Sequence, residues 1–245
     1  MSERAGASTA ASPTIAQVVL IAVFVTALVT AQLTAAKVLA IELPVAIPFA
    51  GDGAGTLFLP GAALAYALTF LASDCYAELY GRRAAQIVVN VAFAMNFVVV
   101  ALVLSTIALP ASANSPVDPA TFEAALGPSF AIVIASMAAY LVSQNWDVWV
   151  FHAIRDRTDG AQLWVRNLAS TASSQAIDSV IFVVLGFVVV PALLGGRVMG
   201  LEAAAALVVG QYILKLAIAV LDTPVVYAVV ALVRSQSPRP TPAPE

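Results

Sequence analysis

Charged residues are scarce in this chain: Asp, Glu, Lys and Arg make up 10% of its 245 residues, whereas 61% are hydrophobic. A soluble domain is typically about 25% charged and about 45–50% apolar. The shortage of charge therefore excludes an ordinary soluble domain and favours a protein embedded in a lipid bilayer. The formal net charge of −3 also excludes the strongly basic surface that a nucleic-acid partner would need.

Cysteine and histidine are almost absent, with Cys75 and His152 the only ones. A single cysteine cannot form an internal disulfide, and the two residues together cannot supply a zinc-finger type site. The chain also lacks the P-loop pattern G-x-x-x-x-G-K-[ST], the esterase pattern G-x-S-x-G and the metalloprotease pattern H-E-x-x-H. We therefore expect neither a metal nor a cofactor, and we do not expect an enzyme.

Long apolar runs are the main positive feature of the sequence. A helix that crosses a membrane needs about 20 mostly apolar residues. Six such runs are present, at 15–41, 57–80, 85–109, 129–154, 168–194 and 201–233, separated by joints rich in Gly and Pro. They predict an all-α, multi-pass protein of the cell (plasma) membrane, with six transmembrane helices in one bundle over residues 15–234. The polar ends, 1–14 and 235–245, are expected to be disordered tails.

The arginines predict the orientation of the bundle. Positively charged residues favour the cytoplasmic joints of a membrane protein. The joints after the second and fourth runs and the C-terminal tail hold Arg82, Arg83, Arg155, Arg157, Arg166, Arg234 and Arg239. The opposite side holds only Arg197. Both termini are therefore expected in the cytoplasm, as an even number of helices also requires.

Six charged side chains interrupt the apolar runs. They are Lys37, Asp74, Asp147, Asp178, Lys215 and Asp222. A charge inside hydrocarbon is costly, so such residues usually face a bundle interior or a wet cavity and mark a path for a ligand, ion or proton. We therefore expect them to locate the function.

Helical spacing places polar groups on shared faces of the predicted helices. The pairs at i,i+3 or i,i+4 are Asp74 with Glu78, Gln144 with Asp147, Ser174 with Asp178, and Gln211 with Lys215. Each polar face is narrow, so the faces are expected to converge on the interior while aliphatic residues meet lipid. Two interpretations remain open for Trp146: an aromatic at the membrane interface, or a ring that stacks on substrate.

Five blocks of sequence, taken in order, resemble a known family. They are LTAAKVLA, FLASDCYAELYGRRAA, QNWDVWVFHAIRDRTDG, LWVRNLASTASSQAIDSVIF and QYILKLAIAVLDTPVVY. Together they resemble the queuosine precursor transporter family, which has also been described as vitamin uptake transporters. The resemblance implies a six-helix importer of 7-deazaguanine precursors of modified tRNA bases. The substrates would be 7-cyano-7-deazaguanine and its 7-aminomethyl form, salvaged from outside the cell.

Given such a substrate, residue chemistry suggests binding roles. A carboxylate can accept both the ring N–H and the exocyclic amino group of a guanine-like edge, a role for Asp178 or Asp147. The donors for the ring carbonyl would be Lys215, Gln175, Asn145 or Gln144, and the apolar faces would be Trp146, Tyr212 or Phe182. Candidates for proton or ion coupling are Asp74, Asp222 and Glu78, and the other polar path residues are Lys37 and Asn167.

Other functions fit the same pattern. The chain could be the substrate-binding membrane subunit of a vitamin importer, powered by separate ATPase subunits, since it has no ATP motif of its own. An intramembrane enzyme or a structural bundle without a substrate is the alternative of another class. Homo-oligomerisation and energy-coupling subunits both stay open as partners.

Overall fold

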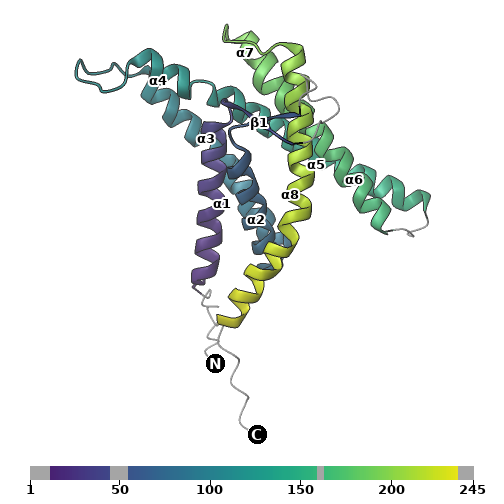
Figure 1. Cartoon of the computed structure of the whole chain (residues 1–245). Coiled ribbons are helices and arrows are strands. Elements are labelled where there is room, and N and C mark those ends of the chain that lie inside the picture. The colour runs from purple at the N-terminus through teal and green to yellow at the C-terminus, as the bar shows by residue number, and fades with distance from the viewer. Residues whose placement is uncertain (1–11, 45–54, 159–162, 237–245) are drawn as a thin grey trace, which may run out of the picture.

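The computed structural model describes residues 12–44, 55–158 and 163–236, and these are mostly helical (Figure 1). The elements in chain order are α1 (Ile15–Thr34), β1 (Val38–Glu42), β2 (Thr56–Pro60), α2 (Ala63–Tyr80), α3 (Arg82–Ala108), α4 (Pro119–Leu126), α5 (Ser129–Arg157), α6 (Leu163–Val183), the π-helix η1 (Val184–Val189), α7 (Val190–Leu193) and α8 (Leu201–Gln236). Most of the two predicted tails, 1–11 and 237–245, lies outside the described residues.

Six long helical segments correspond to the six predicted runs, because α6, η1 and α7 follow one another without a break. Within the described ranges, five segments are long and apolar enough to cross a membrane. The chain is therefore a multi-pass membrane protein. The sixth segment, α2, has only 18 residues and carries Asp74 and Glu78, so the prediction of six spanning helices is confirmed only in part.

A β-hairpin contradicts the all-α prediction. Strands β1 and β2 are antiparallel, with Val38 opposite Pro60 and Glu42 opposite Thr56. The sequence analysis had placed 38–41 in the first helix and 57–60 in the second. Short apolar runs with β-branched residues fit a strand as well as a helix, and periodicity does not separate the two.

The hairpin also corrects the position of Lys37. Helix α1 ends at Thr34, and Lys37 is an exposed residue in the turn before β1. The prediction of a lysine inside a spanning helix is therefore wrong.

Two glycines seat the hairpin against the helices. A Cβ atom at Gly210 of α8 would overlap the Phe58 carbonyl of β2, so only glycine allows the strand to lie this close to the helix. A Cβ atom at Gly61 would overlap the Thr34 carbonyl, and the Gly61 N–H donates to the Lys37 carbonyl at 2.5 Å. These close contacts fix the hairpin between α1 and α8.

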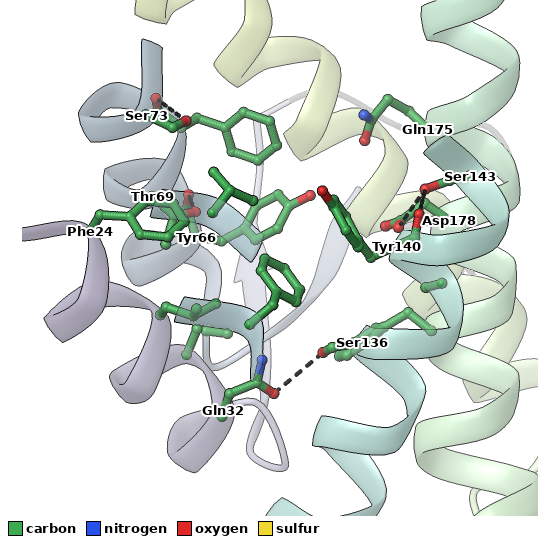
Figure 2. Close-up of a pocket in the computed structure, with 18 of the residues that line it drawn as sticks. Phe24, Gln32, Tyr66, Thr69, Ser73, Ser136, Tyr140, Ser143, Gln175 and Asp178 are labelled. Atoms are coloured by element: carbon green, nitrogen blue, oxygen red, sulfur yellow. Dashed lines mark hydrogen bonds between the residues drawn. The ribbon is translucent and has the colours of Figure 1, made fainter. Parts of the chain in front are cut away.

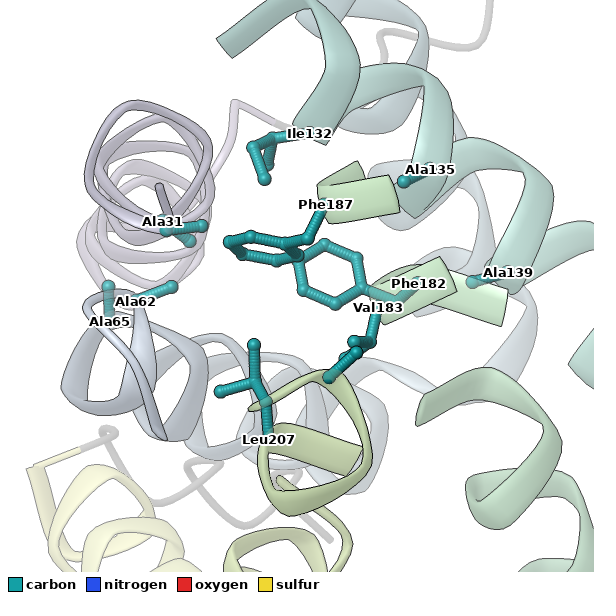
Figure 3. Packing of buried hydrophobic residues seen from close by; sticks show 12 residues of the cluster. Ala31, Ala62, Ala65, Ile132, Ala135, Ala139, Phe182, Val183, Phe187 and Leu207 are labelled. Atoms are coloured by element: carbon teal, nitrogen blue, oxygen red, sulfur yellow. The ribbon is translucent and has the colours of Figure 1, made fainter. Parts of the chain in front are cut away.

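The core consists of small residues around two phenylalanines. Figure 3 shows Phe182 and Phe187 pointing to the centre of a cluster that also contains Ala31, Ile132 and Leu207. Many other members are alanines, which let neighbouring helices approach closely in a membrane.

The π-helix η1 precedes a proline that cannot continue a regular hydrogen-bond ladder. Pro191 has no N–H for the Phe187 carbonyl four residues earlier. The Met199 N–H donates to that carbonyl instead, at 2.9 Å. This bond ties the loop before α8 to the C-terminal part of the α6–α7 segment.

Three helix ends meet at one end of the molecule: the start of α1, the end of α2 and the end of α8 (Figure 1). The hydroxyls of Thr14 and Tyr80 are 3.1 Å apart, and Arg234 Nη2 donates to Glu78 Oε1 at 3.1 Å. The two ends of the helical domain thus share one side, as an even number of crossings requires. That this side is cytoplasmic stays a prediction.

Candidate functional site

A cavity of about 450 Å³ lies between α1, α2, α3, α5, α6 and α8. Cavities that bind small molecules usually measure about 300–1,000 Å³. Its lining runs from Pro60, the last residue of the hairpin, to Arg82 and Gln86 at the start of α3. The cavity is therefore large enough for a small ligand and extends from beneath the hairpin toward the end where the termini of the helical domain meet.

Aromatic side chains form much of the cavity wall. They are Phe24, Tyr66, Phe70, Phe93, Tyr140 and Phe182. Figure 2 shows Tyr66 of α2 and Tyr140 of α5 extending toward one another across the cavity. The Tyr140 ring stacks on Phe93 with the centroids 4.6 Å apart. Such walls suit a flat, apolar ring system.

The Tyr140 hydroxyl is held by two side-chain amides from α3. It donates to Asn90 Oδ1 at 3.1 Å and accepts from Gln86 Nε2 at 2.7 Å. Gln86 Nε2 also donates to Asn90 Oδ1 at 2.9 Å. Together with the Phe93 contact, this network fixes the orientation of the ring.

An ion pair joins α6 to α8 at the cavity wall. Lys215 Nζ donates to Asp178 Oδ2, and Ser143 Oγ of α5 donates to Asp178 Oδ1 at 3.3 Å. The Lys215 side chain is only 2% exposed, and its ammonium lies 5.6 Å from the centre of the Tyr66 ring. Asp178 lines the cavity, whereas Lys215 stands behind it. The negative charge of Asp178 is therefore already balanced.

Side-chain amides complete the lining. Gln32, Gln144, Gln175 and Gln211 all contribute to it. Gln32 Oε1 accepts from Ser136 Oγ at 3.3 Å. The buried Oε1 atoms of Gln175 and Gln211 have no hydrogen-bond partner among the residues that the structure describes.

Two carboxyl groups meet between α2 and α8. Asp74 lines the cavity, and the carboxyl group of Asp222 on α8 lies close to it. Glu78, one turn further along α2, instead pairs with Arg234. Across the described ranges, no three His, Cys, Asp or Glu side chains gather as a metal site would require.

Four of the polar residues predicted for the site line the cavity: Asp178, Gln175, Gln144 and Asp74. Lys215 and Asp222 do not line the cavity themselves but lie next to two residues that do, Asp178 and Asp74. The others lie outside its lining: Asp147, Asn145, Trp146, Tyr212, Glu78, Lys37 and Asn167. Phe182, expected as an apolar face, is part of the wall.

The residues that follow Gln144 on α5 form other contacts instead of lining the cavity. Asp147 accepts from Ser174 Oγ of α6 at 3.2 Å, and Trp146 Nε1 donates to Ser173 Oγ at 3.1 Å. Asn145 Nδ2 donates to the Leu141 carbonyl at 2.6 Å. These side chains therefore serve the α5–α6 contact or the helix itself.

Sequence reasoning gave no site role to Tyr66, Tyr140, Gln32 or Gln211, which all line the cavity. A tyrosine within an apolar run gives no signal that separates packing from binding. The two glutamines were detectable as lone amides in hydrophobic helices, and Gln211 was expected on the same face as Lys215.

Comparison with known proteins assigns the chain to a family. Residues 60–229, more than half of the chain, match the family described as "Putative vitamin uptake transporter". The chain is also similar to the "Probable queuosine precursor transporter" of Bacillus subtilis (strain 168), at 28% identity over 165 residues, which are 66% of this chain and 68% of that protein. No solved structure gives a significant match. With a ligand-sized cavity enclosed by membrane helices, the chain belongs to this vitamin uptake transporter family and is a membrane transporter, not an enzyme.

Proposed function

We propose that this chain imports 7-deazaguanine precursors of modified tRNA bases, namely 7-cyano-7-deazaguanine, its 7-aminomethyl form, or both. The observation that carries the proposal is the cavity of about 450 Å³ in the centre of the helices, walled by aromatic rings and amides. The name of the similar Bacillus subtilis protein points to the same class of substrate.

The aromatic walls suit the flat bicyclic ring of such a base. Tyr66 and Phe182 approach from α2 and α6, and Tyr140 is held from behind by Phe93. Ring contacts of this kind contribute about 0.5–1.5 kcal/mol beyond the burial of area. In this role the three cavity rings replace Trp146 and Tyr212, which point elsewhere.

The polar edge of the base would meet the α6 side of the cavity. Asp178 Oδ1 receives one hydrogen bond from Ser143 and has remaining lone pairs for a ligand N–H. Gln144 can donate to a ring carbonyl from the neighbouring helix. Lys215 acts through Asp178 by holding its carboxylate in position, and Asp147 acts by holding α5 against α6.

Asp74 and Asp222 are our candidates for energy coupling. Two ionised carboxylates in contact repel strongly, so such a pair suits the binding of one shared proton. The cavity lining also holds Arg82, and the Cys75 thiol lies close to both carboxyl groups. Glu78 is less suited to the role because Arg234 already neutralises it.

Uncoupling tests this coupling role. Collapse of the proton gradient should lower uptake by wild type, and Asp74→Asn should make the remaining uptake insensitive to the uncoupler. Glu78→Gln is the matched control and should keep the sensitivity. If the uncoupler does not change uptake by wild type, Asp74 and Asp222 do not couple uptake to the proton gradient.

Growth rescue tests the function itself. A bacterial host that cannot make the precursor, supplied with it externally, should regain the modified tRNA base only when this chain is expressed. Asp178→Ala should abolish the rescue when it is compared with wild type at matched membrane levels, because loss of one partner of a buried charged pair typically costs about 2–5 kcal/mol. Full rescue by this variant would refute the role of Asp178, and no rescue by wild type would refute the proposed substrate.

Reconstitution distinguishes the proposed importer from the ATP-dependent alternative. Purified chain in liposomes should accumulate or equilibrate labelled precursor without any other protein. If uptake instead requires added ATPase and coupling subunits, the chain is a substrate-binding subunit, as a vitamin importer of that kind would require.

A further inference from the structure

Two acceptor oxygens beside the cavity have no hydrogen-bond partner. They are Oε1 of Gln175 on α6 and Oε1 of Gln211 on α8, and both are shielded from solvent in the described part of the chain. A buried acceptor left unpaired loses its hydration without compensation, and folded proteins keep few of them. Gln32 provides the contrast, because it lines the same cavity but its oxygen accepts from Ser136.

The two amides flank the ion pair of Asp178 and Lys215. Gln175 precedes Asp178 by three residues on α6, and Gln211 precedes Lys215 by four on α8, so each amide shares a helix face with one member of the pair. Figure 2 shows the Gln175 amide reaching from α6 toward the cavity. The terminal torsion of glutamine is broad, so a small turn of either amide would bring its oxygen to a molecule in the cavity.

The chemistry of these oxygens defines what they can bind. An amide oxygen accepts hydrogen bonds without contributing a charge. The neighbouring carboxylate is already balanced by Lys215 and bonded to Ser143. The two amide oxygens are therefore the acceptors on this side of the cavity that suit neutral N–H donors. A cation would meet little net charge here.

We infer that Gln175 and Gln211 determine specificity by accepting hydrogen bonds from the N–H groups of a planar heterocycle whose ring system is uncharged and carries a ring amino group. This inference rests on the proposed function and names the part of the substrate that the site reads. A ligand of the same shape without the amino group leaves one acceptor unpaired, and it binds more weakly for that reason.

A pair of ligands tests the inference. The purified full-length chain is given tritiated 7-cyano-7-deazaguanine, and binding and uptake are competed with the unlabelled compound or with its counterpart lacking the exocyclic amino group. Wild type should prefer the amino compound by about tenfold to a hundredfold, the range expected when one buried acceptor loses its donor. In whichever of Gln211→Leu and Gln175→Leu removes the acceptor of the amino group, the preference should fall to about threefold or less.

Two further variants separate recognition from packing. Gln211→Glu keeps an acceptor oxygen at the same position and should retain a preference of about tenfold or more. Gln32→Leu alters an amide that already has a protein donor, so the ratio between the two compounds should stay at its wild-type value.

The outcomes distinguish the inference from the proposed function. Leucine variants that bind the labelled base with the wild-type ratio overturn the inference and leave the function standing. A folded leucine variant that binds neither compound also overturns it, because the compound without the amino group should bind wild type and variant alike. Wild type that binds neither compound overturns the proposed function, and the inference with it.

Discussion

At the scale of residues, the ion pair of Asp178 and Lys215 is the most informative contact. Lys215 is almost completely buried, and its charge is compensated by Asp178 and by the face of the Tyr66 ring. A charge buried in hydrocarbon without a partner is costly, so each member depends on the other. The pair thereby links the wall of the cavity to the stability of the α6–α8 contact.

Removing one member of the pair should destabilise the protein more than removing both. Lys215→Met leaves Asp178 buried without its cation and should cost about 3–5 kcal/mol. The double variant Lys215→Met with Asp178→Leu replaces both charges and should recover much of that loss. Thermal unfolding of the detergent-solubilised variants measures the difference. Equal Tm values for the single and double variants would show that the two charges are not coupled.

The Tyr140 hydroxyl should matter through the position of the ring. Tyr140→Phe removes the hydrogen bonds to Asn90 and Gln86 but keeps the stacking on Phe93. A single hydrogen bond contributes about 0.5–1.5 kcal/mol, so the KM for uptake should rise about two- to tenfold. Tyr140→Leu, which also removes the aromatic face, should raise it further. A KM for Tyr140→Phe at the wild-type value would mean that the hydroxyl network does not orient the ring.

At the scale of elements, the β-hairpin closes the cavity on the side away from the termini of the helical domain. Pro60, the last residue of β2, also lines the cavity, and the hairpin is seated on α8 at Gly210. The close approach of strand and helix backbones means that neither can shift independently. The position of the hairpin over the cavity therefore depends on Gly210.

Gly210→Ala should displace the hairpin. The added methyl group would overlap the Phe58 carbonyl, and forced overlaps of this kind typically cost about 1–3 kcal/mol. We expect a lower Tm together with reduced uptake. Gly200→Ala is the control, since a Cβ atom there meets nothing within 4 Å. A wild-type Tm and uptake rate for Gly210→Ala would contradict the described seat of the hairpin.

The sequence predicts the helices better than the hairpin. Five of the six runs are long enough that a helix is the only structure able to carry them across a bilayer. Residues 38–41 and 57–60 are apolar throughout, so they lack the alternation that would mark a half-exposed strand. Their pairing depends on the close contacts at Gly61 and Gly210, which a single sequence does not reveal.

The sequence also predicts only part of the candidate site. Spacing along one helix identifies faces, such as that of Gln211 and Lys215, but it does not say which faces meet. Asp178 and Asp147 were equivalent candidates, and only the packing of α5 against α6 separates them: one lines the cavity and the other bonds to Ser174. Tyr66 and Tyr140 gain their importance from lying opposite each other, which is a property of the fold.

At the scale of the whole molecule, both ends of the helical domain lie on one side, joined by the contacts of Thr14 with Tyr80 and of Glu78 with Arg234. The arginine distribution predicts that this side is the cytoplasm. The sole cysteine, Cys75, is fully buried, so introduced cysteines can report the orientation without interference.

Labelling with a membrane-impermeant maleimide should confirm the orientation. Ala113→Cys, in the exposed loop between α3 and α4, should react in intact cells. Asp156→Cys, near the end of α5, should react only after the membrane is permeabilised. The reverse pattern would mean that the protein has the opposite orientation in the membrane, with the cavity residue Arg82 on the outer side.

The hairpin also constrains how deep the protein sits. Strand β1 pairs only with β2, in the sole sheet of the described ranges, and most of its residues are exposed. Unpaired backbone groups cannot face hydrocarbon, so the open edge of β1 must be wetted by solvent or lipid headgroups. Gly210, where the hairpin contacts α8, lies nine residues after Leu201. The first turns of α8, about 14 Å in length, therefore project beyond the level of the hairpin. Pro60 belongs both to this strand pair and to the cavity lining, so the hairpin end of the cavity lies close to the membrane surface.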